Sequence, residues 1–196
     1  MRIKSFILLF LIPSLAAGQS YKHYKLLQDR LVIELTEGAM NIIPLSDKAI
    51  RVQWEKGLPK EENELILNRP LQVQPVSFSE NDSCLKLSTS SLTASFNKQN
   101  LAILFTDKSG KIFLSEKAGS RKLTDTKTGS TTSYIAEQGF ISPEDESLFG
   151  LGQFQDGHFN LRNISRKLVQ VNTQIAIPFL YSSKGYGILW HQYGLT

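Results

Sequence analysis

Apolar residues recur at every second position along much of the chain. Successive side chains of a β-strand point to opposite faces, so a period of two indicates strands with one buried face. No stripe with the 3.6-residue period of an amphipathic helix occurs after residue 18. The pattern therefore predicts an all-β protein. The clearest runs are Leu31, Ile33 and Leu35, then Ile50, Val52 and Trp54, then Leu85 and Leu87, and then Leu92, Ala94 and Phe96.

Three of the predicted strands follow one another closely. Residues 101–105 are apolar at every position, which is typical of a strand covered on both faces. The polar residues 97–100 and 107–110 on its two sides have the composition of tight turns, so a meander of antiparallel strands is expected up to residue 114. Residues 55–63, 115–133 and 142–146 are interpreted as polar connections. Many short strands around one core predict an antiparallel β-sandwich.

The first eighteen residues have the composition of a signal peptide. Arg2 and Lys4 precede an apolar run from residue 6 to residue 15, and the small residues 16–18 offer a cleavage site. The run is far shorter than the ~20 apolar residues that cross a bilayer, so we expect no membrane span. The sequence thus predicts export to the periplasm or the extracellular space, with the mature domain at residues 19–196.

Charge and cysteine content exclude several classes of protein. The formal charge is +4, and removal of Arg2 and Lys4 leaves 20 basic and 18 acidic residues, a charge of +2. Nucleic-acid binding requires basic residues gathered on one face, so no nucleic-acid partner is expected. Cys84 is the only cysteine, which excludes an internal disulfide and suggests a small strand residue.

The sequence contains no self-sufficient catalytic motif. Nucleophile elbows, Walker loops and zinc-binding patterns are all absent, and Gly150-Leu151-Gly152 lacks the third glycine of a dinucleotide fingerprint. The acids at 144–146 could act as a general acid and base, but such a run next to a proline is more often a solvated loop. We expect no cofactor, no metal and no catalytic residue in this chain. The histidines, His23, His158 and His191, are too widely separated in sequence to indicate a site.

The last fifty residues carry several linked motifs in one order. They are Glu146, Phe149 and Gly150-Leu151-Gly152, then Asn172, Ile177-Pro178-Phe179 and Ser183-Lys184-Gly185-Tyr186-Gly187. This segment resembles the N-terminal sandwich domain of glycoside hydrolase family 31, the retaining α-glucosidases and α-xylosidases. The resemblance implies a galactose mutarotase-like supersandwich. The form Gly-Leu-Gly-Gln at 150–153, with Asn160, Arg162 and Trp190, is closer to the α-xylosidases.

The resemblance also implies where sugar is bound and where it is cleaved. In the family, a loop of this domain reaches the first sugar subsite, and often carries an aspartate two residues after the asparagine matched by Asn172. Gln174 stands at that position, and its amide can hydrogen-bond a hydroxyl without bringing charge. Asn172 and Gln174 are therefore the candidate substrate-binding residues. The loop 153–162 and the turn 172–174 are expected to face the mouth of the catalytic barrel.

The family's two catalytic aspartates lie on a (β/α)₈ barrel that follows this domain. The chain ends at Thr196, before such a barrel, so we expect an incomplete sandwich whose partner is the missing barrel and whose ligands are α-xylosides or α-glucosides. A strand at 186–190 is expected to form an open edge. The alternative is a stand-alone carbohydrate-binding or structural sandwich, in which Phe154, Phe159 or Tyr181 would stack on sugar rings.

Overall fold

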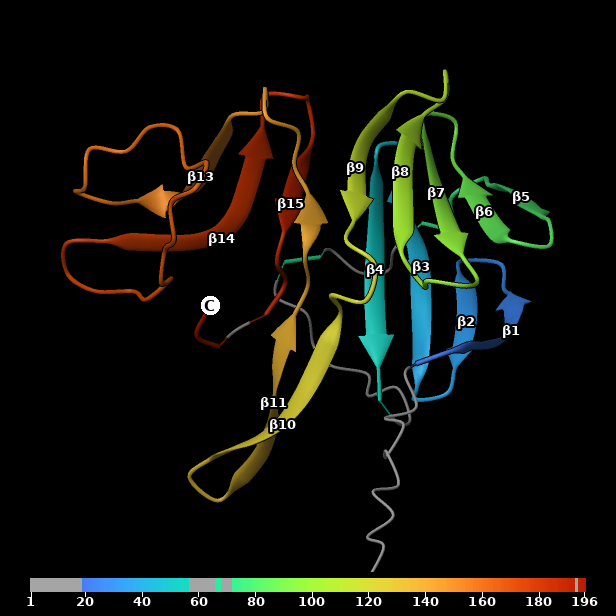
Figure 1. Cartoon of the computed structure of the whole chain (residues 1–196), viewed down its shortest axis with the longest axis horizontal. Coiled ribbons are helices and arrows are strands. Elements are labelled where there is room, and N and C mark those ends of the chain that lie inside the picture. Colours follow the sequence, from blue (N-terminus) through green and yellow to red (C-terminus); the bar gives the residue numbers. More distant parts are fainter. Residues whose placement is uncertain (1–18, 57–65, 68–71, 193) are drawn as a thin grey trace, which may run out of the picture.

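A computed structural model of the chain describes residues 19–56, 66–67, 72–192 and 194–196. These residues form β-strands joined by turns and loops, and no helix occurs among them. Every strand pairing is antiparallel, which confirms the predicted all-β class (Figure 1). The predicted signal peptide, residues 1–18, lies outside the described residues.

The first sheet has four strands in sequence order. They are β1 (Tyr21–Leu26), β2 (Leu31–Leu35), β3 (Ala39–Ser46) and β4 (Ala49–Glu55). In β2 the alternation predicted from the sequence is exact, since Leu31, Ile33 and Leu35 are buried and the two residues between them are half-buried. The period of two therefore places one face of this sheet against the core.

The second sheet has six strands in the order β12-β9-β8-β7-β6-β5. Their bounds are β5 (Ser77–Glu80), β6 (Cys84–Ser88), β7 (Leu92–Asn97), β8 (Ile103–Asp107), β9 (Ile112–Glu116) and β12 (Phe140–Ile141). Strands β7 to β9 form the predicted meander. Asn97 Oδ1 accepts the backbone N–H groups of Gln99 and Asn100, at 2.9 and 3.0 Å, and so closes the first turn. Asp107 Oδ1 closes the second by accepting from Ser109 and Lys111.

The prediction for residues 101–105 was partly wrong. The strand begins at Ile103, because Leu101 has a left-handed backbone conformation, with φ of 61°, and belongs to the preceding turn. Ile103 and Phe105 are buried and Leu104 is only half-buried, so one face is covered more than the other. An unbroken apolar run did not distinguish a strand with two covered faces from a turn followed by an ordinary strand.

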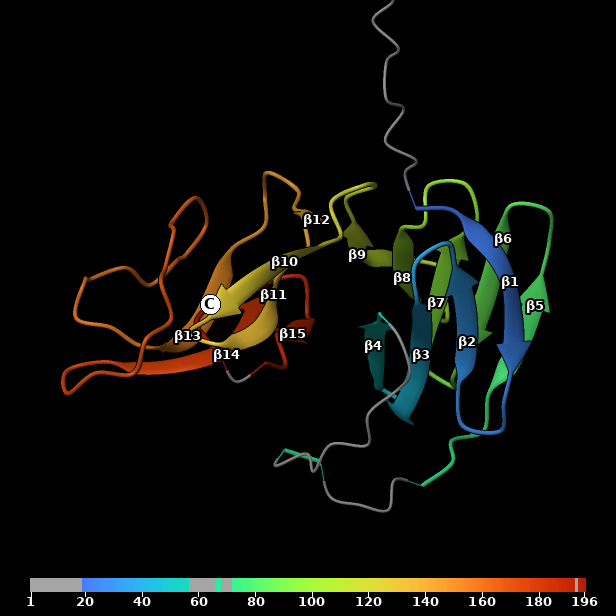
Figure 2. The same ribbon diagram turned by 90° about the horizontal axis from the view of Figure 1, so that it is seen from below.

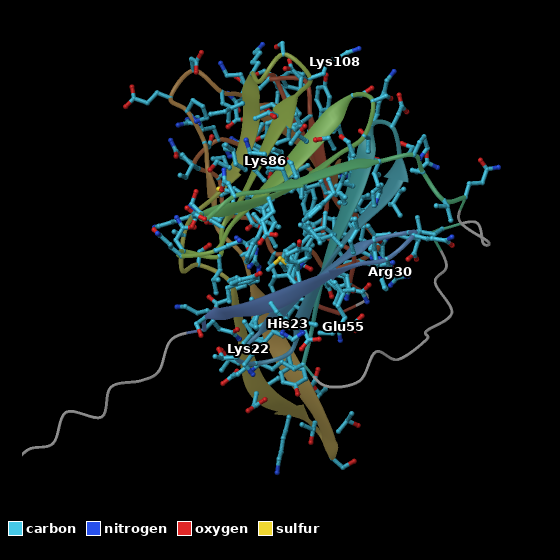
Figure 3. All side chains as sticks on the ribbon, turned by 90° about the vertical axis from the view of Figure 1, so that its right-hand side faces the viewer. Lys22, His23, Arg30, Glu55, Lys86 and Lys108 are labelled. Atoms are coloured by element: carbon cyan, nitrogen blue, oxygen red, sulfur yellow. The ribbon has the colours of Figure 1, made fainter. Side chains whose placement is uncertain are left out.

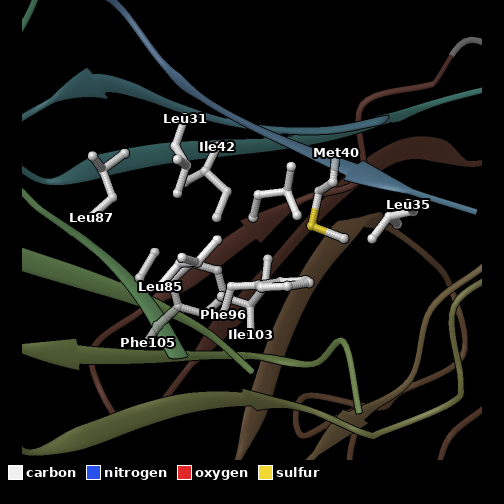
Figure 4. Close-up of a cluster of buried hydrophobic side chains, with 11 residues drawn as sticks. Leu31, Leu35, Met40, Ile42, Leu85, Leu87, Phe96, Ile103 and Phe105 are labelled. Atoms are coloured by element: carbon white, nitrogen blue, oxygen red, sulfur yellow. The ribbon is translucent and has the colours of Figure 1, made fainter. Parts of the chain in front are cut away.

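The core lies between the two sheets (Figure 4). It is entirely apolar, and Phe96 is its largest fully buried side chain. Burial of one such side chain contributes about 1.5–3 kcal/mol. Since Cys84 is a free thiol, this packing stabilises the sandwich without a disulfide among the described residues. The core residues are Leu31, Ile33, Leu35, Met40 and Ile42 from the first sheet and Leu85, Leu87, Ala94, Phe96, Ile103 and Phe105 from the second.

The remaining strands lie to one side of this sandwich (Figures 1 and 2). They form a hairpin, β10 (Lys122–Thr128) and β11 (Thr131–Glu137), and a three-stranded sheet, β13 (Leu148–Gln153), β14 (Ile175–Ser182) and β15 (Gly187–Leu189). The hairpin corrects the expectation of a polar connection at 115–133. Both of its faces are largely exposed, so its residues carry no apolar alternation that could have revealed it.

Both sheets of the sandwich carry basic and acidic side chains. Figure 3 labels titratable side chains on several elements of the sandwich. The described residues also contain no helix long and apolar enough to cross a membrane. The labelled side chains are those of Lys22, His23, Arg30, Glu55, Lys86 and Lys108.

Candidate functional site

The two candidate substrate-binding residues lie in one tight turn. Residues 171–174 are closed by a bridge between Val171 and Gln174, in which the Gln174 N–H donates to the Val171 carbonyl at 3.2 Å. Asn172 is exposed and Gln174 is half-buried. The turn leads directly into β14, so a rigid strand determines its position. It therefore presents two amide side chains at one end of the three-stranded sheet.

The neighbouring backbone supports this turn. Gln170 Oε1 accepts the N–H of Ala176 at 3.1 Å, which ties the residues on the two sides of the turn together. A hollow of about 390 Å³ lies next to the turn; its lining includes Gln170, Ala176, Pro178 and Gln192, and does not include Asn172 or Gln174. The amide side chains at this concave surface are those of Gln170 and Gln192, and amides can hydrogen-bond sugar hydroxyls as donor or as acceptor.

Glycines bring β13 unusually close to β14. The pairing register shifts between Gly150 and Gly152, where Leu151 has a φ of 63°. Gly152 has a φ of 102°, and a Cβ placed there would lie 1.9 Å from the carbonyl oxygen of Ile175. The Gly-Leu-Gly segment is thus a strand bulge that no larger residue could form. This agrees with its interpretation as a backbone bend rather than part of a nucleotide site.

The loop predicted to accompany the turn lies only partly beside it. Gln153 pairs with Ile175 and is therefore next to the turn. The chain then runs back, and Asn160 Oδ1 accepts the N–H of Leu148 at 3.1 Å, at the opposite end of β13. Arg162 is also at that end, where its Nη1 donates to Ser142 Oγ at 2.6 Å. Asn160 and Arg162 consequently hold the loop to its base and lie away from Asn172 and Gln174.

An ion pair stacked on an aromatic ring stiffens the middle of this loop. Arg166 Nη2 donates to both carboxylate oxygens of Asp156, at 2.8 and 2.7 Å. The guanidinium carbon of Arg166 lies 4.2 Å from the centre of the Phe154 ring, a cation–π geometry. Phe154 is therefore occupied by this contact. Phe159, by contrast, is 83% exposed and Tyr181 is 50% exposed.

A buried carboxylate connects the base of the loop to the three-stranded sheet. Glu146 is 1% exposed, and its side chain accepts hydrogen bonds from the hydroxyls of Ser142, Ser182 and Tyr186, the last at 2.5 Å. Arg162 lies close by, and its Nη1 also approaches the Glu146 carbonyl at 3.4 Å. Three segments thus meet at one acid: residues 142–146, the loop at Arg162 and the turn 182–186. This is a positioning arrangement, because a buried charge requires nearly ideal partners.

The pKa values of Glu146 and Tyr186, the two titratable groups of this cluster that bond to each other, shift in opposite directions. Burial alone would raise the pKa of the Glu146 carboxyl, but the three hydroxyl donors and the charge of Arg162 together lower it. Burial raises the pKa of the Tyr186 phenol to about 12, and its hydrogen bond to Glu146 acts in the same direction. At neutral pH the pair is therefore an ionised carboxylate and a neutral phenol.

This acid corrects part of the sequence analysis. Of the run 144–146, interpreted there as a solvated loop, Glu144 and Asp145 are exposed, and Asp145 pairs with Lys184 on the surface. Glu146 is instead buried. One sequence feature did distinguish Glu146 from its neighbours: it stands at the start of the linked motifs, four residues before Gly150. Period and composition alone could not separate one buried acid from its two solvated neighbours.

The other residues considered as ligands are not assembled into a site. His23 lies on β1 beside Glu34, at 3.2 Å, and Cys84 begins β6 as a half-buried strand residue. Within the described residues, no group of three histidine, cysteine or acidic side chains is placed to bind a metal. A second hollow, of about 260 Å³, lies at the end of the sandwich beside Trp54 and the buried pair Glu116–Arg121, remote in the fold from the turn at 171–174.

Comparison with known proteins relates this arrangement to a family. The family model of the glycosyl hydrolase 31 N-terminal galactose mutarotase-like domain matches residues 39–196. An α-xylosidase of Saccharolobus solfataricus is 32% identical over 167 residues, which cover 77% of this chain and 22% of that protein.

Two crystal structures of family 31 α-xylosidases are similar to the fold. The enzyme from Xanthomonas citri has a TM-score of 0.76 at 26% identity, over 87% of this chain and 19% of the other. The enzyme from a soil metagenome, complexed with xylose, has a TM-score of 0.72 at 26% identity, over 86% of this chain and 28% of the other. The chain thus spans only 19% to 28% of the length of these relatives.

Proposed function

Because this chain belongs to glycoside hydrolase family 31, as its N-terminal galactose mutarotase-like domain, we propose that it is the non-catalytic N-terminal domain of an exported retaining α-glycosidase. In this proposal the domain packs on a catalytic barrel and helps to shape the first sugar subsite. The substrates are α-xylosides or α-glucosides, and the nucleophile and the acid/base belong to the barrel.

The observation that carries the proposal is the turn at 171–174. It presents Asn172 and Gln174 at the end of β14, between Gln170 and Ala176, which line the hollow. Glutamine at this position favours recognition of neutral hydroxyls over recognition of charge. The similarity to several α-xylosidases over most of this chain supports xylosides as the first substrates to test.

The test uses a grafted enzyme. Residues 19–196, which include the matched region 39–196, replace the corresponding segment of the Saccharolobus solfataricus α-xylosidase, and hydrolysis of an aryl α-xyloside is measured. We expect Gln174→Ala to lower kcat/KM about 5- to 10-fold, the value of one hydrogen bond of about 1–1.4 kcal/mol. Thr173→Ala, at an exposed position of the same turn, is the matched control and should leave the kinetics unchanged. Equal kinetics for Gln174→Ala and the unmodified graft would remove Gln174 from the subsite.

A second candidate function rests on the exposure of Phe159. An aromatic ring that is 83% exposed suits stacking on a sugar in a stand-alone binding module. That function predicts that the isolated chain binds xylo-oligosaccharides in calorimetry and that Phe159→Ala abolishes binding. The N-terminal domain proposal predicts no turnover by the isolated chain, and binding that depends on the barrel.

A further inference from the structure

One face of the three-stranded sheet is apolar and exposed along its whole length. The odd-numbered residues of β14 point to this face, because strand side chains alternate. Each is between 43% and 50% exposed, and Leu189 on β15 is 46% exposed. We call this set the outer face; its members are Ile175, Ile177, Phe179, Tyr181 and Leu189.

The pairing register makes the outer face continuous. Phe179 lies directly opposite Leu189, and Tyr181 directly opposite Phe149 on β13. Directly paired side chains are about 4.5–5.5 Å apart at their Cβ atoms, so these residues touch or nearly touch across the strands. The ring of Phe159 lies 4.9 Å from that of Phe149 and extends the apolar surface beyond the sheet.

The opposite face of the same sheet is less exposed, and the sandwich packs near the end that carries Ser182. Leu180 and Ile188 are half-buried there, Ser182 is buried, and Tyr186 packs its ring 6.0 Å from Phe113 of the sandwich. The exposure of the outer face is therefore not a general property of a small sheet. Contiguous apolar surface of this kind on one side only is a mark of an interaction surface.

Building on the proposed function, we propose that the outer face is the surface through which this domain docks on the barrel-bearing part of a family 31 glycosidase. The relatives place about three quarters or more of their length outside the region that matches this chain, so a large partner of the same polypeptide is available. The outer face carries no charged residue on β14 or β15, as in permanent, hydrophobic interfaces.

This choice of face also accounts for the position of the turn. Ile175, at one end of the outer face, follows Gln174 immediately in the chain. Docking through the outer face consequently brings Asn172 and Gln174 to the border of the interface. A substrate-contacting turn has to lie at such a border, because it must reach a partner's site without being covered by the interface.

Hydroxyl-radical footprinting tests the docking directly, since it oxidises accessible aromatic side chains. The oxidation of Phe179 and Tyr181 is compared between the full chain at submicromolar concentration and the graft described above. We expect at least fivefold protection of both residues in the graft. Tyr24, which lies on β1 at the far side of the sandwich in Figure 1, is the internal reference and should be oxidised equally in both proteins.

Substitution provides the second measurement. Ile177→Thr keeps a β-branched side chain but removes apolar surface from the outer face, and should lower the melting temperature of the graft. Ile135→Thr, at a position 54% exposed on β11, is the matched control and should lower it less. Equal oxidation of Phe179 and Tyr181 in the chain and the graft would overturn the docking proposal.

The same footprinting experiment would also detect binding of a second copy of the chain to the outer face. In that case the protection of Phe179 and Tyr181 would rise with the concentration of the isolated chain, and light scattering would give a doubled mass. If the graft also added no protection, the outer face would bind a second copy of the chain, and the docking proposal would be wrong. The proposed function is judged separately, because Gln174→Ala changes the kinetics of the graft whichever surface docks.

Discussion

Substitution of Glu146 by alanine should destabilise the domain more than any change at its neighbouring acids. The carboxylate is 1% exposed and accepts hydrogen bonds from three hydroxyls. A hydrogen bond to a charged group contributes about 1.5–3 kcal/mol to stability. Because the freed hydroxyls can rotate and recover part of this energy, we expect a net loss of about 3–5 kcal/mol, the range typical for breaking a buried charged cluster.

Such a loss is a large fraction of the roughly 5–15 kcal/mol by which a domain is stable. Glu146→Ala is compared with Asp145→Ala in urea unfolding at pH 7. Asp145 is next in sequence, but its side chain is 75% exposed and pairs with Lys184 at the surface, so its removal should destabilise the domain much less. Glu146→Gln keeps the shape and one acceptor, and should lie between the two.

The refuting result is a loss below about 1 kcal/mol for Glu146→Ala with an unchanged slope of the unfolding curve. It would mean that the hydroxyls of Ser142, Ser182 and Tyr186 find equivalent partners without the carboxylate. The cluster would then be a consequence of the fold around it and not one of its supports.

Three further outcomes are expected. Because the folded pKa of Glu146 is lowered, its contribution to stability is complete above the ordinary pKa of 4.5 and is lost as the pH falls below it. Because the pKa of Tyr186 is raised to about 12, its contribution is complete below pH 10 and is lost between pH 10 and 12. Urea unfolding measured across both pH ranges checks the two losses. Gly152→Ala should cost about 3 kcal/mol through its clash with the backbone, against about 1 kcal/mol for Gly157→Ala, where the added Cβ meets nothing within 4 Å; equal thermal shifts would contradict this. Phe96→Ala should cost about 3–5 kcal/mol in the same unfolding assay, and a loss below 1 kcal/mol would mean that the core repacks around it.

The sandwich was predictable because its strands obey one simple rule. In β2 and β7 the apolar positions alternate, and the structure buries all three in β2 and two of three in β7, where Leu92 is half-buried. The turns after Asn97 and Asp107 were predictable for a similar reason, since these short polar side chains bond to backbone N–H groups two to four residues further on.

The hairpin at β10 and β11 followed no such rule. Its side chains are exposed on both faces, so pairing between its own two strands holds it and no buried face leaves a pattern. For residues 101–105, by contrast, a clear apolar pattern led to a prediction that was partly wrong. Their continuous apolar run concealed the left-handed turn at Leu101, which only the path of the chain between β7 and β8 requires.

Some features of the candidate site likewise follow from the local sequence, and others depend on the tertiary structure. The sequence by itself determined that Asn172 and Gln174 are close together and that the glycines at 150 and 152 make a bend, because these are local properties of neighbouring residues. The tertiary structure decided that Gln153 lies beside the turn while Asn160 and Arg162 lie at the other end of β13. It also decided that Glu146 is buried and that the odd-numbered side chains of β14 are exposed. Burial depends on which distant segments pack on a residue, and alternation in one strand specifies two faces without specifying which of them is covered.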